Sequence, residues 1–117
     1  MSLLAKIQGN KEKRGAKLQA ILNSLVKELG TLGALRIVLF GSFSRGEIDV
    51  GSDLDLLVIM PSGKTGKEWR DLIYGTVERT AGVDLIVFNE KEFRENLPRS
   101  AFLRNAIKGK MIYEKAV

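Results

Sequence analysis

The stretch "LFGSFSRGEIDVGSDLDLLVIM", residues 39–60, joins two apolar runs through a loop rich in glycine, serine and charged residues. The second run opens with two carboxylates one residue apart, Asp53 and Asp55. Side chains alternate along a β-strand, so this spacing places both carboxylates on one face. Core packing gives no reason for charges at the start of a buried strand. The pattern therefore indicates a binding site where this strand begins.

The flanking sequence predicts an α/β fold, with mixed α and β elements in a single domain over residues 1–117. We expect a small mixed sheet of three or four strands covered by helices, because the strands are apolar on nearly every position. The first half of the chain is expected to form a helix over 13–29 ended by Gly30, a turn over 31–33, a strand over 34–40 and a short helical turn. A strand over 53–60 stopped by Pro61, a helix over 67–80 and a strand over 83–88 are expected to follow. The chain is expected to end with a short helix capped by Asn89, a helix from about Pro98 and an extended segment over 111–115.

A third acid, Asp84, lies second in the strand over 83–88. If that strand lies beside the one over 53–60, Asp84 reaches the same site as Asp53 and Asp55. Three carboxylates at one sheet edge repel each other, and a divalent cation removes that cost. Oxygen ligands of this kind suit Mg²⁺ or Mn²⁺. Taken singly, Asp53 is explained by turn chemistry and Asp84 by solvation at a strand end.

Gly41 and Ser42 follow the first strand directly. Glycine allows close approach of a ligand to the backbone, and the amides after it can bind anions. Ser42 adds a hydroxyl donor and Arg45 can neutralise phosphate charge. Taken alone, Gly41 and Ser42 fit an ordinary turn between two strands. The segment "SGKTG" over 62–66 lacks the first glycine of a P-loop, so Lys64 is interpreted as a loop residue.

The composition excludes several classes of chemistry. The chain has no Cys and no His, which removes disulfides, thiolate nucleophiles, Ser-His-Asp triads and histidine metal sites. The net charge is +5, but residues 37–88 carry five Lys/Arg against eight Asp/Glu, whereas residues 89–117 carry seven against four. The acidic middle fits a cation site, and most of the basic residues are interpreted as solvated helix faces.

The combined motif resembles the DNA polymerase β-like nucleotidyltransferase superfamily. The matching residues are Gly41-Ser42, Arg45-Gly46, Ser52-Asp53-Leu54-Asp55-Leu56 and Asp84. The short chain is similar to the minimal nucleotidyltransferase (MNT) branch, which is often paired with a HEPN-domain protein. The resemblance spans nearly the whole chain in element order and is specific over residues 39–60.

The resemblance implies a role for each matching residue. Asp53, Asp55 and Asp84 are expected to be catalytic and to hold two Mg²⁺ ions, with Asp84 helping to activate the acceptor hydroxyl. Gly41, Ser42, Arg45 and Ser52 are expected to bind the phosphates of ATP. In the minimal branch the implied acceptor is a tyrosine of the HEPN toxin, whose adenylylation would silence it and make this protein an antitoxin.

Two other functions stay open at this stage. One is nucleotidyl transfer to a small molecule or an RNA end, which the basic segments at both ends of the chain keep open, although they lack the interleaved aromatic residues of single-strand binders. The other is an antitoxin that acts by binding alone. No apolar run is long enough to span a membrane, so we expect a cytoplasmic protein without a membrane partner. A homo- or hetero-oligomer is left open, with contacts expected around Trp69 or on the last helix.

Overall fold

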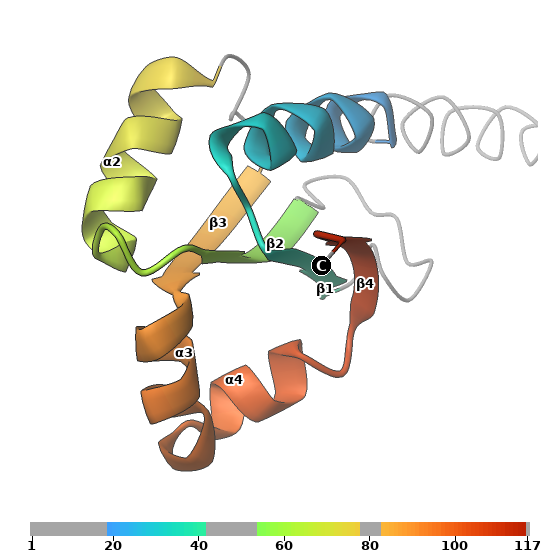
Figure 1. Cartoon of the computed structure of the whole chain (residues 1–117). Coiled ribbons are helices and arrows are strands. Elements are labelled where there is room, and N and C mark those ends of the chain that lie inside the picture. Colours follow the sequence, from blue (N-terminus) through green and yellow to red (C-terminus); the bar gives the residue numbers. More distant parts are fainter. Residues whose placement is uncertain (1–18, 42–53, 78–82, 117) are drawn as a thin grey trace, which may run out of the picture.

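The computed structural model describes residues 19–41, 54–77 and 83–116 of the chain, and Figure 1 shows them in colour. A first helix runs over residues 19–32. The elements that follow it are β1 (Arg36–Phe40), β2 (Leu54–Met60), α2 (Gly66–Thr76), β3 (Val83–Asn89), α3 (Glu90–Asn96), a 3₁₀ turn (Leu97–Arg99), α4 (Ala101–Ala106) and β4 (Lys110–Glu114). No helix within these ranges is long and apolar enough to cross a bilayer.

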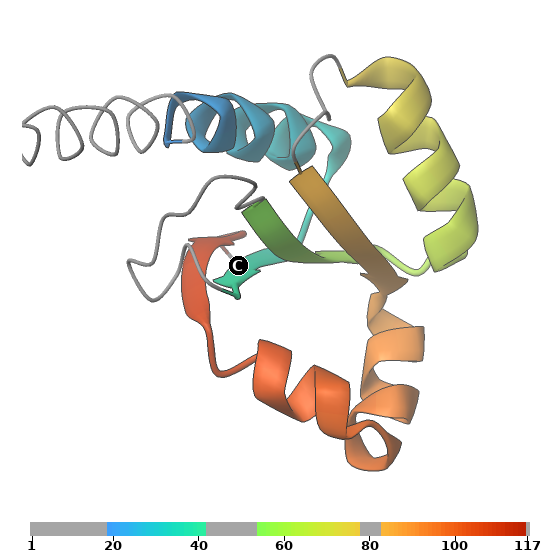
Figure 2. The same ribbon diagram turned by 180° about the vertical axis from the view of Figure 1, so that it is seen from behind.

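The four strands form one mixed sheet in the order β3-β2-β1-β4. β1 is antiparallel to both β2 and β4, whereas β2 and β3 are parallel and are joined through α2. Helix 19–32 and α2 cover one face of this sheet, and α3 and α4 cover the other (Figure 1; Figure 2 shows the reverse view). The predicted mixed fold with a helix-covered sheet is confirmed.

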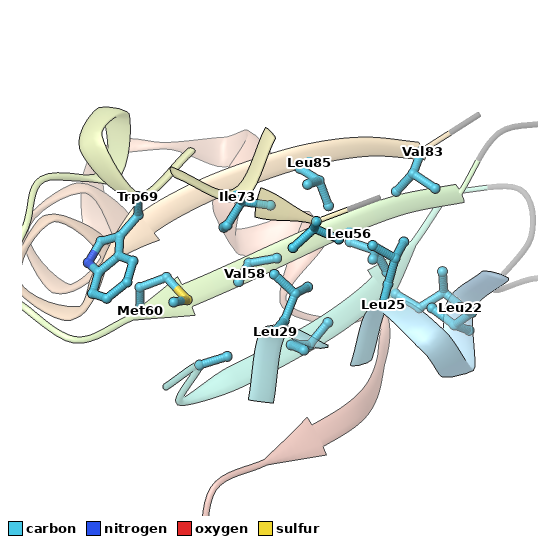
Figure 3. Close-up of a cluster of buried hydrophobic side chains, with 14 residues drawn as sticks. Leu22, Leu25, Leu29, Leu56, Val58, Met60, Trp69, Ile73, Val83 and Leu85 are labelled. Carbon is cyan, nitrogen blue, oxygen red and sulfur yellow. The ribbon is translucent and has the colours of Figure 1, made fainter. Parts of the chain in front are cut away.

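Two cores form because both faces of the sheet are covered. Leu56, Val58 and Met60 of β2 join the core under helix 19–32 and α2, which Figure 3 shows in detail. The alternate residues Leu57 and Ile59 join the core under α3 and α4. All five side chains are fully buried, which explains why this strand is apolar at every position from 56 to 60.

The first helix ends later than predicted. It continues through residue 32, so the predicted stop at Gly30 and turn over 31–33 are wrong. Gly33 adopts a φ of 109° and its N–H donates to the Gly30 carbonyl, while the Ala34 N–H donates to the Leu29 carbonyl. This is a glycine C-cap, which needs a left-handed residue. Gly30 instead makes room for Tyr113 of β4, because a Cβ there would lie 3.3 Å from the tyrosine ring.

Two later helix boundaries also differ from the prediction. α2 begins at Gly66 after the N-cap Thr65 and ends at Thr76, because Val77 is extended; residues 78–80 of the predicted helix lie outside the described ranges. Pro98 begins no α-helix and lies in the 3₁₀ turn. α4 begins at Ala101, after Ser100, whose hydroxyl accepts a hydrogen bond from the Leu103 N–H.

The predicted extended segment near the C-terminus is β4, paired with β1.

One carboxylate joins the beginnings of α2 and α3. Asn89 caps α3 as predicted, by accepting from the Glu92 N–H at 2.7 Å. In return Glu92 Oε1 accepts from the Asn89 N–H at 2.9 Å and from the Gly66 N–H at 2.8 Å. At the start of α2, a similar hydrogen bond from the Thr65 backbone N–H is the main cause that lowers the pKa of Glu68.

Replacing Glu92 with Ala should lower the free energy of unfolding by about 2 kcal/mol, since two N–H groups lose a charged acceptor. Glu92→Gln should recover part of this loss because it keeps one carbonyl oxygen. Glu95→Ala, on an exposed position of the same helix, serves as the control. Urea denaturation measures all three, and equal effects of Glu92→Ala and Glu95→Ala would contradict the assigned junction.

Gly66→Ala and Gly75→Ala should act in opposite directions although both lie in α2. A Cβ at Gly66 would lie 2.6 Å from the Val87 carbonyl oxygen, whereas nothing lies within 4 Å of one at Gly75. We expect the first change to cost about 1–3 kcal/mol through overpacking and the second to add up to about 1 kcal/mol through helix propensity. Thermal denaturation followed by circular dichroism provides the measurement; a neutral Gly66→Ala would refute the close approach.

Candidate active site

Two of the predicted acids lie side by side at one end of the sheet. Asp55 is the second residue of β2 and Asp84 the second of β3, and the parallel register pairs them directly. Paired residues on neighbouring strands lie about 4.8 Å apart and project to the same face. This is the face of Leu57 and Ile59, which α3 and α4 cover further along the strands. Asp55 is half-buried and Asp84 is exposed, so the pair opens to solvent on one side.

Gly41 lies against the Asp55 carboxylate. The antiparallel register pairs Phe40, the last residue of β1, with Asp55, so Gly41 leaves the strand beside that acid. Its φ is 81°, which favours glycine. A Cβ at Gly41 would lie 2.2 Å from Asp55 Oδ2 and 3.1 Å from Cγ. The absence of a side chain at residue 41 therefore leaves the space that the Asp55 carboxylate occupies.

The remaining predicted site residues are Ser42, Arg45, Ser52 and Asp53, and they lie outside the described residues. Their roles stay predictions. The structure thus brings Gly41, Asp55 and Asp84 to one place and describes no position for the other four.

The chemistry of the placed residues fits a hard cation. Two carboxylates on adjacent strands, one half-buried, repel each other and are relieved by a divalent metal. Carboxylate oxygens are the ligands that Mg²⁺ and Mn²⁺ prefer. Within the described ranges no group of three or more acids could hold a metal ion, and the third predicted ligand, Asp53, is not among those residues.

Lys64 lies at the other end of the sheet. Its carbonyl accepts from Asn89 Nδ2 at 2.9 Å, and its ammonium lies 5.6 Å from the centre of the Trp69 ring. Asn89 pairs with Met60, five residues along β2 from Asp55, which corresponds to roughly 17 Å. The interpretation of Lys64 as a loop residue fits this position.

A groove of about 450 Å³ lies away from the acids, between helix 19–32 and the end of α2. Its lining includes Lys27, Glu28, Thr31, Thr76 and Val77. Both of these helices cover the face opposite to that of Asp55 and Asp84. The groove therefore does not belong to the acid site.

Comparison with protein families agrees with the site geometry. A family model described as "Nucleotidyltransferase domain" matches residues 19–113, which is most of the chain. The chain belongs to the nucleotidyltransferase domain family. This assignment confirms the DNA polymerase β-like superfamily and a nucleotidyl transfer activity of the family's general kind. None of the curated proteins compared with the chain matches it.

The nucleotidyltransferase site has neighbours that the motif did not indicate. Phe102 of α4 lies edge-on to Phe40, with ring centroids 5.7 Å apart, and Phe40 is the register partner of Asp55. The position of Phe102 in α4 is a weak signal for this contact. Leu103 and Ala106 form the buried side of α4, and Phe102 is a large apolar residue outside that side.

Gly41→Ala should abolish the activity of this nucleotidyltransferase, and Gly33→Ala should not. Both glycines have positive φ, so each alanine costs about 1–2 kcal/mol of backbone strain. Only at Gly41 would the new methyl group displace the Asp55 carboxylate, since Pro61 Cγ, 3.8 Å away, is the nearest atom at Gly33. Denaturation curves and nucleotide-binding calorimetry on both variants separate the two effects. Full nucleotide binding by a folded Gly41→Ala variant would contradict this assignment.

Proposed function

We propose that this protein transfers AMP from ATP to a hydroxyl group of a partner protein, with Mg²⁺ bound by Asp55, Asp84 and Asp53. The observation that carries the proposal is the pairing of Asp55 with Asp84 beside Gly41 in a nucleotidyltransferase domain. The resemblance to the minimal branch supports a tyrosine of a HEPN-domain toxin as acceptor, and hence an antitoxin role.

The reaction is an in-line displacement at the α-phosphorus of ATP. The acceptor oxygen forms a bond to that phosphorus, the bond to the oxygen bridging to the β-phosphorus breaks, and pyrophosphate leaves. Asp84 takes the proton of the acceptor hydroxyl, and its exposure leaves room for an acceptor to approach. Asp55 lies against Gly41, and this position supports its proposed role of holding Mg²⁺ at the phosphates. When bound, Mg²⁺ supplies charge stabilisation to the phosphates and lowers the pKa of the attacking hydroxyl.

An acceptor carried by another macromolecule suits the exposed position of the acid pair. Asp84 is exposed at the sheet end, and the groove that the structure describes lies on the opposite face. A tyrosine side chain of a docked protein can reach such a surface. The same exposure admits an RNA 3′ end, and the net charge of +5 suits a nucleic acid.

Asp55→Asn and Asp84→Asn should each reduce transfer by roughly a thousandfold or more, because metal binding supplies several kcal/mol of transition-state stabilisation. Asp71→Asn, on the exposed side of α2, should have no effect. The measurement is the intact mass of a HEPN-domain partner incubated with protein, Mg²⁺ and ATP, beside a parallel assay on RNA 3′ ends.

Each outcome selects one function. A nucleotide-sized mass gain on the partner that both Asn variants lose supports protein adenylylation. Labelling of RNA alone supports terminal transfer. A partner that is silenced equally by wild type and Asn variants, with no mass gain, would show that the protein acts by binding alone and would refute the catalytic proposal.

A further inference from the structure

An exposed aromatic ring lies beside the acid pair. Phe102 is 51% exposed although it is one of the largest apolar side chains of α4. Its neighbours Leu103 and Ala106 are buried, so the core does not require a ring at residue 102. The contact that fixes its position is the edge-on packing against Phe40, at 84° between the ring planes. One side of the Phe102 ring is thus held by the protein while half of the side chain faces solvent.

The position of this ring follows from the strand register. Phe40 pairs with Asp55 across β1 and β2, and Asp55 pairs with Asp84 across β2 and β3. Phe40, Asp55 and Asp84 therefore form a row across three strands on the sheet face that α4 covers, and Phe102 packs against the Phe40 end of this row. One strand spacing added to the 5.7 Å ring separation places Phe102 roughly 10 Å from Asp55. A nucleotide whose α-phosphate lies at the acids can reach this ring with its base.

The turn between α4 and β4 packs against the end of β1 that carries Phe40. Lys108 and Lys110 are exposed and flank Gly109. A Cβ at Gly109 would lie 2.3 Å from the Leu39 carbonyl oxygen and 3.1 Å from Phe40 Cβ, so this turn lies directly against the end of β1. The register partner of Lys110 is Leu39, which belongs to the core on the other face of the sheet, so Lys110 projects away from the face of Phe40 and Phe102.

We propose that Phe102 stacks on the base of the nucleoside triphosphate bound at Asp55 and Asp84. The inference rests on the proposed function and adds the contact that holds the base. Stacking on an aromatic side chain tolerates every base, because each base has a π-face, and favours those that stack strongly. The ring thus gives affinity, with a preference for purine over pyrimidine nucleotides.

The first test compares substitutions at Phe102 by calorimetry with Mg²⁺ and a non-hydrolysable ATP analogue. Phe102→Ala should weaken binding roughly ten- to a hundredfold, as expected for one lost stack. Phe102→Leu, which keeps an apolar contact with Phe40, should lose as much, and Phe102→Tyr should bind as the wild type does. Tyr74→Ala removes an exposed ring on α2 as the matched control. Inorganic triphosphate, which has no base, should bind wild type and Phe102→Ala equally.

The second test gives a readout that a structural role would not move. In Phe102→Trp the new indole should lose fluorescence when ATP binds, and inorganic triphosphate should leave it unchanged. The native Trp69 is only 8% exposed, and its indole N–H donates to the Pro61 carbonyl at 2.8 Å. It lies near Met60, at the other end of β2, so it provides a constant background (Figure 3).

Steady-state kinetics of Phe102→Ala should show a raised KM for ATP at unchanged kcat.

The outcomes separate this inference from the function on which it rests. ATP binding that is lost in Asp55→Asn but unchanged in Phe102→Ala would overturn the stacking role and retain the nucleotide site. Reduced transfer to a protein acceptor at unchanged ATP affinity would overturn it too, by assigning the ring to the acceptor surface. If the wild type binds neither ATP nor triphosphate, the proposed function fails and the stacking role fails with it.

Discussion

The register of β2 within the sheet is the constraint on which the site depends. β2 is hydrogen-bonded on both sides, antiparallel to β1 and parallel to β3, and these two ladders place Asp55 next to Phe40 and Asp84. A slip of one residue would exchange the two faces of the strand, moving the carboxylate into one core and an apolar side chain out of the other. Burial of residues 56–60 on both faces therefore fixes the register and, with it, the position of the charge. The apolar residues of β2 thus determine that Asp55 lies beside Asp84.

Each of the two layers of helices packs against one face of β2. Helix 19–32 and α2 seal the larger core, and the Glu92 carboxylate ties the beginning of α2 to that of α3 at the far end of β2. On the other face, α4 ends in the turn at Gly109, which lies against Leu39 and Phe40. The acids and the Phe40–Phe102 pair thus lie at the end of the sheet opposite to the Glu92 junction. This separation keeps the tightest polar packing away from the surface that must admit a substrate.

Much of this arrangement could be predicted from the sequence. The apolar runs predicted the strands, because periodicity is a local property of the chain. That Asp84 reaches the site depended on its strand lying beside β2, and the structure shows that it does, in parallel pairing. The predicted helix boundaries were wrong where another residue provides the cap. The first helix passes Gly30 because Gly33, with its positive φ, forms the C-cap. α4 begins at Ala101 because Ser100, and not a residue beside Pro98, provides its N-cap. The sequence did not indicate Phe102. This residue is near Asp55 only because it packs against Phe40, which is far away in the sequence and pairs with Asp55.

We propose that the end of β1 and the beginnings of β2 and β3 hold a metal–nucleoside triphosphate complex. Paramagnetic broadening by Mn²⁺ tests it most directly, because the effect falls steeply with distance from the ion. We would record amide spectra of the whole protein with Mn²⁺ and a non-hydrolysable ATP analogue. We expect the signals of Gly41, Asp55 and Asp84 to broaden most, and more than those of Thr31 and Thr76 in the groove on the other face. Strongest broadening at the groove, or none at the three predicted residues, would contradict it.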